Sequence, residues 1–248
     1  GQRAAAHWLA KQSGRFCGGP LVQKLFERLD PACKVQLLVA DGEPVQLGQR
    51  LLELEGPATA LVAGERTALN LAMRLSGIAT ATGELAAQLD GTGVRLADTR
   101  KTTPGLRLFE KYAVRCGGGS NHRMGLDDAA MLKENHLAWA GGMTAAIDAV
   151  RHQAPWPCRV IVEAETGEQA CEAVQAGADG VLLDEFSPEQ LQVLVPRLRQ
   201  LAPGGVVLEA SGVQPEQLRA FAATGIDLIS TSAPMTRSRW LDLSMRFS

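Results

Sequence analysis

The sequence predicts an α/β fold in two parts, an N-terminal α/β part and a barrel-like domain of alternating strands and helices. Before Gly93, stretches of alternating apolar residues surround turn dipeptides such as Asp41-Gly42, which is typical of antiparallel strands. After Gly93, short apolar runs alternate with amphipathic segments, which is typical of parallel β/α units. The 248 residues, 46% hydrophobic and 21% charged, suffice for one large domain or two unequal ones.

In the first ninety residues we expect a helix, a group of short strands and a long helix. The chain begins without methionine, inside an apolar stretch at residues 4–10 that resembles the middle of an element, so we expect the natural start to be missing. Apolar residues at helical spacing predict a helix over residues 20–29. Residues 34–55 alternate and predict antiparallel strands, and residues 58–89 carry the apolar face of a long helix.

Beyond residue 93 we expect six parallel strands with helices between them. The strands are predicted at residues 94–98, 130–133, 159–163, 180–184, 206–210 and 227–230. Helices are predicted at residues 168–175, 188–201 and 215–223, and the last two open with a proline, which suits the first helical turn. In β/α barrels the loops after the strands converge on one mouth, so we expect the functional residues there.

Composition favours a cytoplasmic protein that acts on a small molecule. A net charge of −2 with one tyrosine and six phenylalanines argues against nucleic acid as a partner. No stretch approaches the roughly 20 apolar residues of a membrane span, and the start is no signal peptide. The cysteines are scattered without a Cys-x-x-Cys pair, which predicts reduced thiols rather than a zinc site or redox pair. They are Cys17, Cys33, Cys116, Cys158 and Cys171.

Positive charge is concentrated between Arg95 and His136. This window holds eight of the 25 lysines and arginines and two of the four histidines, against five acidic residues. Like charges repel, so the cluster needs acidic neighbours or an anionic ligand. Glycines, threonines and a proline are interleaved with the charges, and glycine lets backbone amides approach an anion. We interpret the window as a site for a small polyanion, with a solvated face of ion pairs as the alternative.

Polar residues follow the predicted strands where each strand ends. One set is cationic, and the other is acidic or carries hydroxyls. They are Arg100 and Lys101, Lys133, Glu163, Asp184, Ser211-Gly212 and Ser230-Thr231-Ser232. A charge in a barrel mouth is costly unless a ligand or partner neutralises it, so the ordered set predicts a ligand site.

From near its start to its end the chain resembles the quinolinate phosphoribosyltransferase family, the decarboxylating enzymes of NAD synthesis. The resemblance rests on long motifs in the right order. They are Gly64-Glu65-Arg66-Thr67-Ala68-Leu69-Asn70, Leu75-Ser76-Gly77-Ile78-Ala79-Thr80, Asp98-Thr99-Arg100-Lys101-Thr102-Thr103-Pro104-Gly105, Lys111-Tyr112-Ala113-Val114-Arg115-Cys116-Gly117-Gly118-Gly119, Asn121-His122-Arg123-Met124-Gly125-Leu126, Lys133-Glu134-Asn135-His136 and Leu241-Asp242-Leu243-Ser244-Met245-Arg246-Phe247, together with Glu163 and Asp184.

The resemblance implies an architecture, a reaction and an assembly. It implies an N-terminal α/β sandwich-like domain over residues 1–90, an open, incomplete β/α barrel over residues 91–238, and a C-terminal segment over residues 239–248 that returns to the first domain. The pyridine nitrogen of quinolinate would attack the anomeric carbon of phosphoribosyl pyrophosphate. Nicotinate mononucleotide, pyrophosphate and carbon dioxide would be the products. The active unit would be a homodimer or larger homo-oligomer in which Arg66 comes from the neighbouring subunit.

The resemblance also implies roles for individual residues. The substrate-binding residues would be Arg66, Arg100, Lys101, Lys111, His122, Arg123, Lys133, Ser211, Gly212 and Ser232, and the catalytic ones Lys101, Lys133, Glu163 and Asp184. Arginine forks bind carboxylates bidentately, which suits a pyridine dicarboxylate. Carboxylate oxygens suit Mg²⁺, the implied cofactor, which would be bound by Glu163 and Asp184. The match departs at residues 231–237, where many family members carry a Val-Gly-Ala-Leu-Thr-His ending and this chain has Thr-Ser-Ala-Pro-Met-Thr-Arg.

Four alternatives compete with this interpretation. Cys116 near His122 could be a thiol nucleophile, and Lys101 or Lys133 could form a Schiff base with pyridoxal phosphate. A paralogue associated with molybdate transport shares the fold but lacks full matches in two of the motifs that are intact here. A catalytically silent binding protein would be expected to have lost some of the charged residues of the mouth. The intact set favours the enzyme.

Overall fold

The computed structural model describes residues 2–248, which divide into two compact units. The first unit contains the chain up to Glu84 with residues 101–119 and 232–248, and the second contains residues 85–100 and 120–231. Each unit has its own hydrophobic core. The division groups residues by contact rather than by chain order, so the domain boundaries at residues 90 and 238 stay a prediction.

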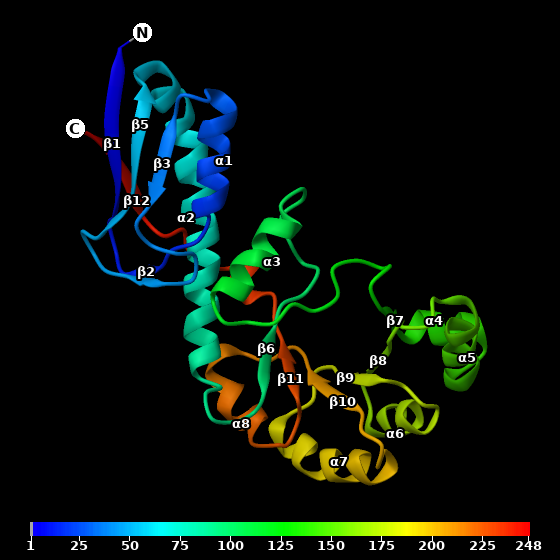
Figure 1. Ribbon diagram of the computed structural model, residues 1–248. Helices are drawn as coiled ribbons and strands as arrows, with labels where there is room; N and C mark the ends of the chain where they lie inside the picture. Colours follow the sequence, from blue (N-terminus) through cyan, green and yellow to red (C-terminus); the bar gives the residue numbers. More distant parts are fainter. Residues whose placement is uncertain (1) are drawn as a thin grey trace. The chain divides into compact units, whose positions relative to one another are not determined.

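A four-stranded antiparallel sheet forms one layer of the first unit (Figure 1). Its strand order is β12-β1-β5-β3, with β1 (Arg3–Ala10) between β12 (Leu243–Phe247) and β5 (Arg50–Pro57), and β3 (Lys34–Leu37) at the edge. The antiparallel strands predicted in the first ninety residues are therefore confirmed. A small additional pair joins β2 (Gly14–Arg15) to β4 (Pro44–Val45).

Helices complete the first unit. The two predicted helices are confirmed as α1 (Gly19–Leu29) and α2 (Ala58–Ala87). α1 buries Val22 and Phe26 against the sheet core, whereas Leu29, the last residue of the helix, lies on the same face but is half exposed. The other helices of this unit are α3 (Arg107–Cys116) and α9 (Ala233–Thr236).

The second unit contains a six-stranded sheet in the order β6-β11-β10-β9-β8-β7, with every neighbouring pair parallel. The strands are β6 (Arg95–Ala97), β7 (Ala130–Leu132), β8 (Val160–Ala164), β9 (Gly180–Leu183), β10 (Val207–Ala210) and β11 (Leu228–Ser230). Each lies within about a residue of its predicted position. β6 and β7 stand at the two edges and do not pair in the described chain. The open, incomplete β/α barrel is therefore confirmed.

Helices follow the strands of the second unit (Figure 1). They are α4 (Glu134–Ala140), α5 (Met143–Gln153), α6 (Gly167–Gln175), α7 (Pro188–Leu201) and α8 (Leu218–Ala222). The predicted helix at residues 215–223 is divided, because its first turn is the tighter 3₁₀ helix η1 (Pro215–Gln217). α7 begins where the Ser187 hydroxyl accepts a hydrogen bond from the Gln190 amide, and Pro188 occupies its first turn, as predicted. Within residues 2–248, no helix has the length and apolar character needed to cross a membrane.

Glycines within α2 let other segments approach this helix closely. A Cβ built at Gly77 would lie 2.1 Å from the carbonyl oxygen of Arg239, and the Leu241 amide donates a hydrogen bond to the Met73 carbonyl at 3.0 Å. The final segment of the chain is thereby held against α2 through backbone contacts.

We expect Gly77→Ala to destabilise the protein by about 1–3 kcal/mol through overpacking, although alanine is otherwise the better helix former. The control is Gly204→Ala, because a Cβ there meets no atom within 4 Å. Thermal unfolding followed by circular dichroism measures both variants. Equal melting temperatures for the two variants would show that the approach of residue 239 does not constrain position 77.

Candidate functional site

The carboxyl ends of the parallel strands bring the predicted strand-end residues of the second unit to one edge of its sheet. The residue that follows each strand, or closes it, supplies the chemistry of this edge. They are Arg100 three residues after β6, Lys133 directly after β7, Glu163 next to the last residue of β8, Asp184 directly after β9 and Ser211 directly after β10. The parallel sheet thus gathers residues that are more than one hundred positions apart.

Asp98, at the end of β6, organises the segment that carries two of the predicted ligands. Its side chain is 1% exposed and accepts hydrogen bonds from the Asn121 Nδ2 at 2.6 Å and the His122 amide at 2.8 Å. The Asp98 amide donates to the Ser120 carbonyl at 3.1 Å. A buried carboxylate must be satisfied in this way, so the motif around Asn121 and His122 is tied to the strand end.

His122 is oriented by a buried acidic residue that the sequence analysis missed. Its Nδ1 accepts a hydrogen bond from the Arg123 amide at 2.7 Å, and its Nε2 lies 3.1 Å from Oε2 of Glu209. Because Nδ1 accepts, the proton lies on Nε2 and is donated to Glu209. Glu209 is 3% exposed, and its Oε1 has no hydrogen-bond partner in residues 2–248. The available signal was an acidic residue inside the otherwise apolar strand β10.

The Arg123 guanidinium is partly buried and lies within the electrostatic influence of Arg100. Arg123 Nη1 donates a hydrogen bond to the Ala129 carbonyl at 2.8 Å, which fixes the side chain. Burial lowers the pKa of the Arg123 guanidinium, and the positive charge of Arg100 lowers it further. Neither cause removes the charge of an arginine near neutral pH, so the pair carries repulsion that an anion would relieve.

Lys133 and Glu163 form an ion pair across β7 and β8. The Lys133 Nζ lies 2.6 Å from Oε2 of Glu163, which is 12% exposed on its side chain. The Lys133 amide donates to Nδ1 of His136 at 3.0 Å, so His136 helps to begin α4, a structural role. Each charge of the pair is neutralised by the other before any substrate binds.

Asp184 and Ser211 connect two neighbouring strand-end loops. The Ser211 hydroxyl donates a hydrogen bond to Oδ1 of Asp184, and the Ser211 amide donates to the Leu183 carbonyl at 3.2 Å. Glu185 adopts φ 57° and Gly212 φ 74°. A left-handed conformation at a residue other than glycine is uncommon and is often found at functional sites. These two loops therefore share the features of a ligand-binding edge.

Carboxylates at this edge could hold a hard cation. Carboxylate oxygens of Glu134, Glu163 and Glu165 lie within 4.8 Å of one another and, with Leu137 and Gln169, line a partly open pocket. Oxygen ligands of this kind fit Mg²⁺ rather than a soft metal. Asp184 is not a member of this group, although its carboxylate also belongs to the edge.

Four predicted ligands belong to the first compact unit. Arg66 is exposed on α2, and Lys101 is exposed after Arg100. Lys111 is 1% exposed within α3, and Ser232 directly precedes α9. They are thus distributed over three segments of that unit.

Glu110 fixes the segment that follows Lys101, and it was also missed. This fully buried carboxylate accepts hydrogen bonds from Nε and Nη2 of Arg74 at 3.1 and 2.8 Å. It also accepts from the amide and hydroxyl of Thr103 at 2.9 and 2.7 Å. Four donors satisfy the charge, so the Thr-Thr-Pro-Gly segment is held firmly to α3.

Comparison with known proteins gives the family. The model of the quinolinate phosphoribosyl transferase N-terminal domain matches residues 1–76, and that of the C-terminal domain matches residues 78–246. The chain is 43% identical over 245 residues to a probable nicotinate-nucleotide pyrophosphorylase [carboxylating] of a Synechocystis species, covering 98% of this chain and 83% of the relative.

A human nicotinate-nucleotide pyrophosphorylase [carboxylating] is 38% identical over 248 residues, covering 99% of this chain and 82% of the relative. The solved nicotinate-nucleotide pyrophosphorylase of Francisella tularensis is 35% identical with a TM-score of 0.93, covering 100% of this chain and 87% of that structure. The chain belongs to the quinolinate phosphoribosyltransferase family.

Proposed function

We propose that this chain transfers the phosphoribosyl group of phosphoribosyl pyrophosphate to quinolinate with loss of carbon dioxide, giving nicotinate mononucleotide for NAD synthesis. Family membership supports the reaction. The single observation that carries the substrate is the partly buried Arg123 guanidinium, which the Ala129 carbonyl holds in place and which lies within the electrostatic influence of Arg100. A dicarboxylate offers a guanidinium a planar bidentate partner and neutralises positive charge at this edge.

Quinolinate binding would depend on side chains whose surroundings already fix them. Arg123 is held by the Ala129 carbonyl, and His122 is held by Glu209. Arg66 would reach the site from the neighbouring subunit of a homodimer or larger homo-oligomer, which its exposure on α2 allows. Because these side chains are already held in place, they lose less conformational entropy when the substrate binds.

The catalytic roles proposed for Lys101 and Lys133 are electrostatic. When the 2-carboxylate leaves as carbon dioxide, negative charge develops on a ring carbon, and a fixed cation stabilises it. Lys133 can turn from Glu163 to the substrate because it is 48% exposed on its side chain. Lys111 would add positive potential from within α3. None of these steps needs Cys116 as a nucleophile.

Glu163 and Asp184 are proposed to face the phosphoribosyl group. Their carboxylates would stabilise the positive charge that develops on the ribosyl carbon as the bond to pyrophosphate weakens. They would also hold Mg²⁺, with water and pyrophosphate as further ligands; when bound, the ion neutralises the charge of the leaving pyrophosphate.

The 5′-phosphate would be held by hydroxyls and backbone amides of Ser211, Gly212 and Ser232. Gly212 is exposed and adopts a left-handed backbone, and it has no side chain that would shield its amide from an anion. We also propose a cytoplasmic location, because all five cysteines are free thiols, as expected in a reducing compartment.

The assignment is tested by incubating the purified protein with quinolinate, phosphoribosyl pyrophosphate and Mg²⁺ and measuring nicotinate mononucleotide, pyrophosphate and carbon dioxide. We expect equal amounts of the three products, and none of them when quinolinate is omitted. Turnover of nicotinate in preference to quinolinate would contradict the proposal, because nicotinate lacks the carboxylate that leaves.

We expect Arg100→Ala to lower kcat/KM for quinolinate roughly 10- to 100-fold, since it removes a charged hydrogen-bond donor to the substrate. Its melting temperature should change far less. The matched control is Arg95→Ala, which removes an exposed arginine at the amino end of the same strand. A loss of stability without a rise in KM would assign Arg100 a structural role instead.

Glu209 is expected to act as a positioning residue through His122. Glu209→Leu leaves the Nε2 proton of His122 without its acceptor, so kcat/KM for quinolinate should fall about tenfold. Glu209→Gln keeps an acceptor oxygen and should recover most of that loss. Steady-state kinetics with each substrate varied in turn measures the effect. Equal activity of the two variants would show that the orientation of His122 does not depend on this hydrogen bond.

A further inference from the structure

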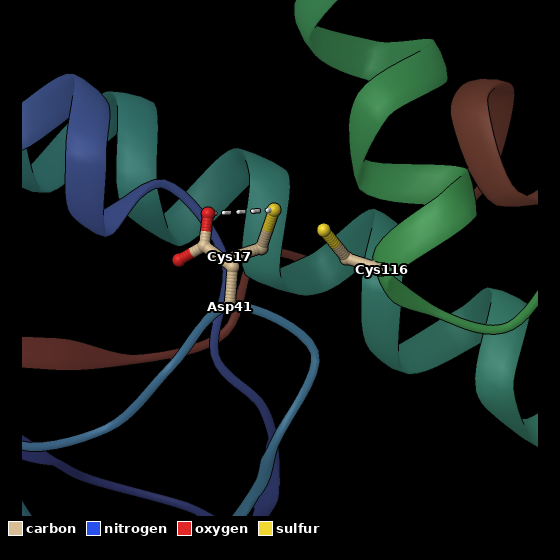
Figure 2. Close-up of side chains that lie close together, drawn as sticks. All are labelled: Cys17, Asp41 and Cys116. Carbon is tan, nitrogen blue, oxygen red and sulfur yellow. Dashed lines mark hydrogen bonds between the residues drawn. The ribbon is translucent and has the colours of Figure 1, made fainter.

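Two cysteines and an aspartate from distant parts of the chain meet in the first unit. Cys17 precedes α1, Asp41 lies in the turn before β4, and Cys116 is the last residue of α3. Both sulfur atoms and a carboxylate oxygen lie within 4.8 Å of one another. Figure 2 shows the two thiols directed toward each other, with the Asp41 carboxylate beside Cys17.

The backbone around Cys17 is firmly held. Its amide donates to the Ser76 hydroxyl at 2.9 Å, and its side chain is fully buried. Gly42 brings the Asp41 turn against α3, because a Cβ at this position, where φ is 91°, would lie 2.8 Å from the Cys116 carbonyl oxygen. The three donor residues are therefore positioned by the fold and not by a flexible loop.

Asp41 is oriented by hydrogen bonds that leave a lone pair on Oδ1 for a further ligand. Its Oδ1 accepts from the Gly19 amide at 2.9 Å, and its Oδ2 accepts from the Gly18 amide at 3.0 Å, the Tyr112 hydroxyl at 2.9 Å and the Cys17 thiol at 4.0 Å. In residues 2–248, no lysine or arginine forms an ion pair with Asp41. Outer contacts of this kind orient the ligands of metal sites.

We propose that Cys17, Asp41 and Cys116 bind a divalent cation of the zinc class, with water as the fourth ligand. Thiolate sulfur selects zinc over magnesium, and carboxylate oxygen is an accepted third ligand. Tetrahedral bonds to zinc place such donor atoms about 3.6–3.8 Å apart. The three donor atoms, now within 4.8 Å of one another, can reach that separation through small rotations of their side chains. Binding releases the protons of the two thiols as both become thiolates.

The metal would link three segments of the first unit that are far apart in the sequence. Cys116 directly precedes Gly117-Gly118-Gly119, and the chain then continues to His122 and Arg123. The site is separate from the proposed Mg²⁺ ligands, whose donors are carboxylates alone. Its expected effect is greater stability of the fold, because metal that binds only the folded state shifts unfolding.

The test uses the full chain, stripped of metal by a chelator, kept reduced, and saturated with Mg²⁺ so that the carboxylate ligands are occupied. We expect one Co²⁺ per chain with a thiolate-to-cobalt charge-transfer band, which carboxylates do not give. Zn²⁺ should displace Co²⁺ and raise the melting temperature by roughly 5–10 °C at a free concentration about 100 times its Kd.

Cys116→Ser should abolish the band and the thermal shift, and Asp41→Asn should weaken both. Asp41→Asn keeps an acceptor oxygen for one of the two glycine amides, so it provides a second variant if Cys116→Ser unfolds. Cys158→Ser is the matched control, because Cys158 lies in the second unit, and it should behave as the wild type.

The proposal is overturned if the wild-type chain gives no thiolate band with Co²⁺. Persistence of the band in Cys116→Ser, or a disulfide between Cys17 and Cys116 that forms in place of metal binding, would overturn it equally.

Discussion

The parallel pairing of six strands is the constraint on which the site depends. Because every pair from β6 to β7 is parallel, each strand ends at the same edge and delivers its next residue there. Charges that are scattered along the chain thus become neighbours. These charges must then be stabilised, and hydrogen bonds such as those of Asp98 and Glu163 serve this purpose.

The edge handles its charges in two different ways. The Lys133 and Glu163 side chains neutralise each other, and Asp98 is satisfied by groups of the Asn121-His122 segment. Arg123, in contrast, lies near a charge of its own sign on Arg100. A like charge nearby disfavours the charged form of a buried guanidinium, and an anionic ligand bound there would remove that penalty.

The sequence predicted those features that depend on local patterns. The six parallel strands and the two helices of the first unit were predicted at their positions because apolar runs and alternation are read within a few residues. The residues after the strands were predicted because the barrel rule assigns them to one edge. Glu209 and Glu110 were missed because their partners are distant: His122 is 87 positions from Glu209, and Arg74 is 36 positions from Glu110. The sequence shows that an acidic residue lies within an apolar segment, but only the fold shows which side chain, such as His122 or Arg74, is its hydrogen-bond partner. The proximity of Cys17 and Cys116 was missed for the same reason, because they are far apart in the sequence and share no motif.

The central claim is that the paired guanidiniums of Arg100 and Arg123 select a dicarboxylate. Titration calorimetry of the protein without phosphoribosyl pyrophosphate, using quinolinate and nicotinate at low and high salt, tests it most directly. Quinolinate should bind at least roughly tenfold more tightly than nicotinate, since one further charged hydrogen bond contributes about 1.5–3 kcal/mol, and the difference should shrink as salt screens the charges. Equal affinities for the two ligands, unchanged by salt, would contradict the account.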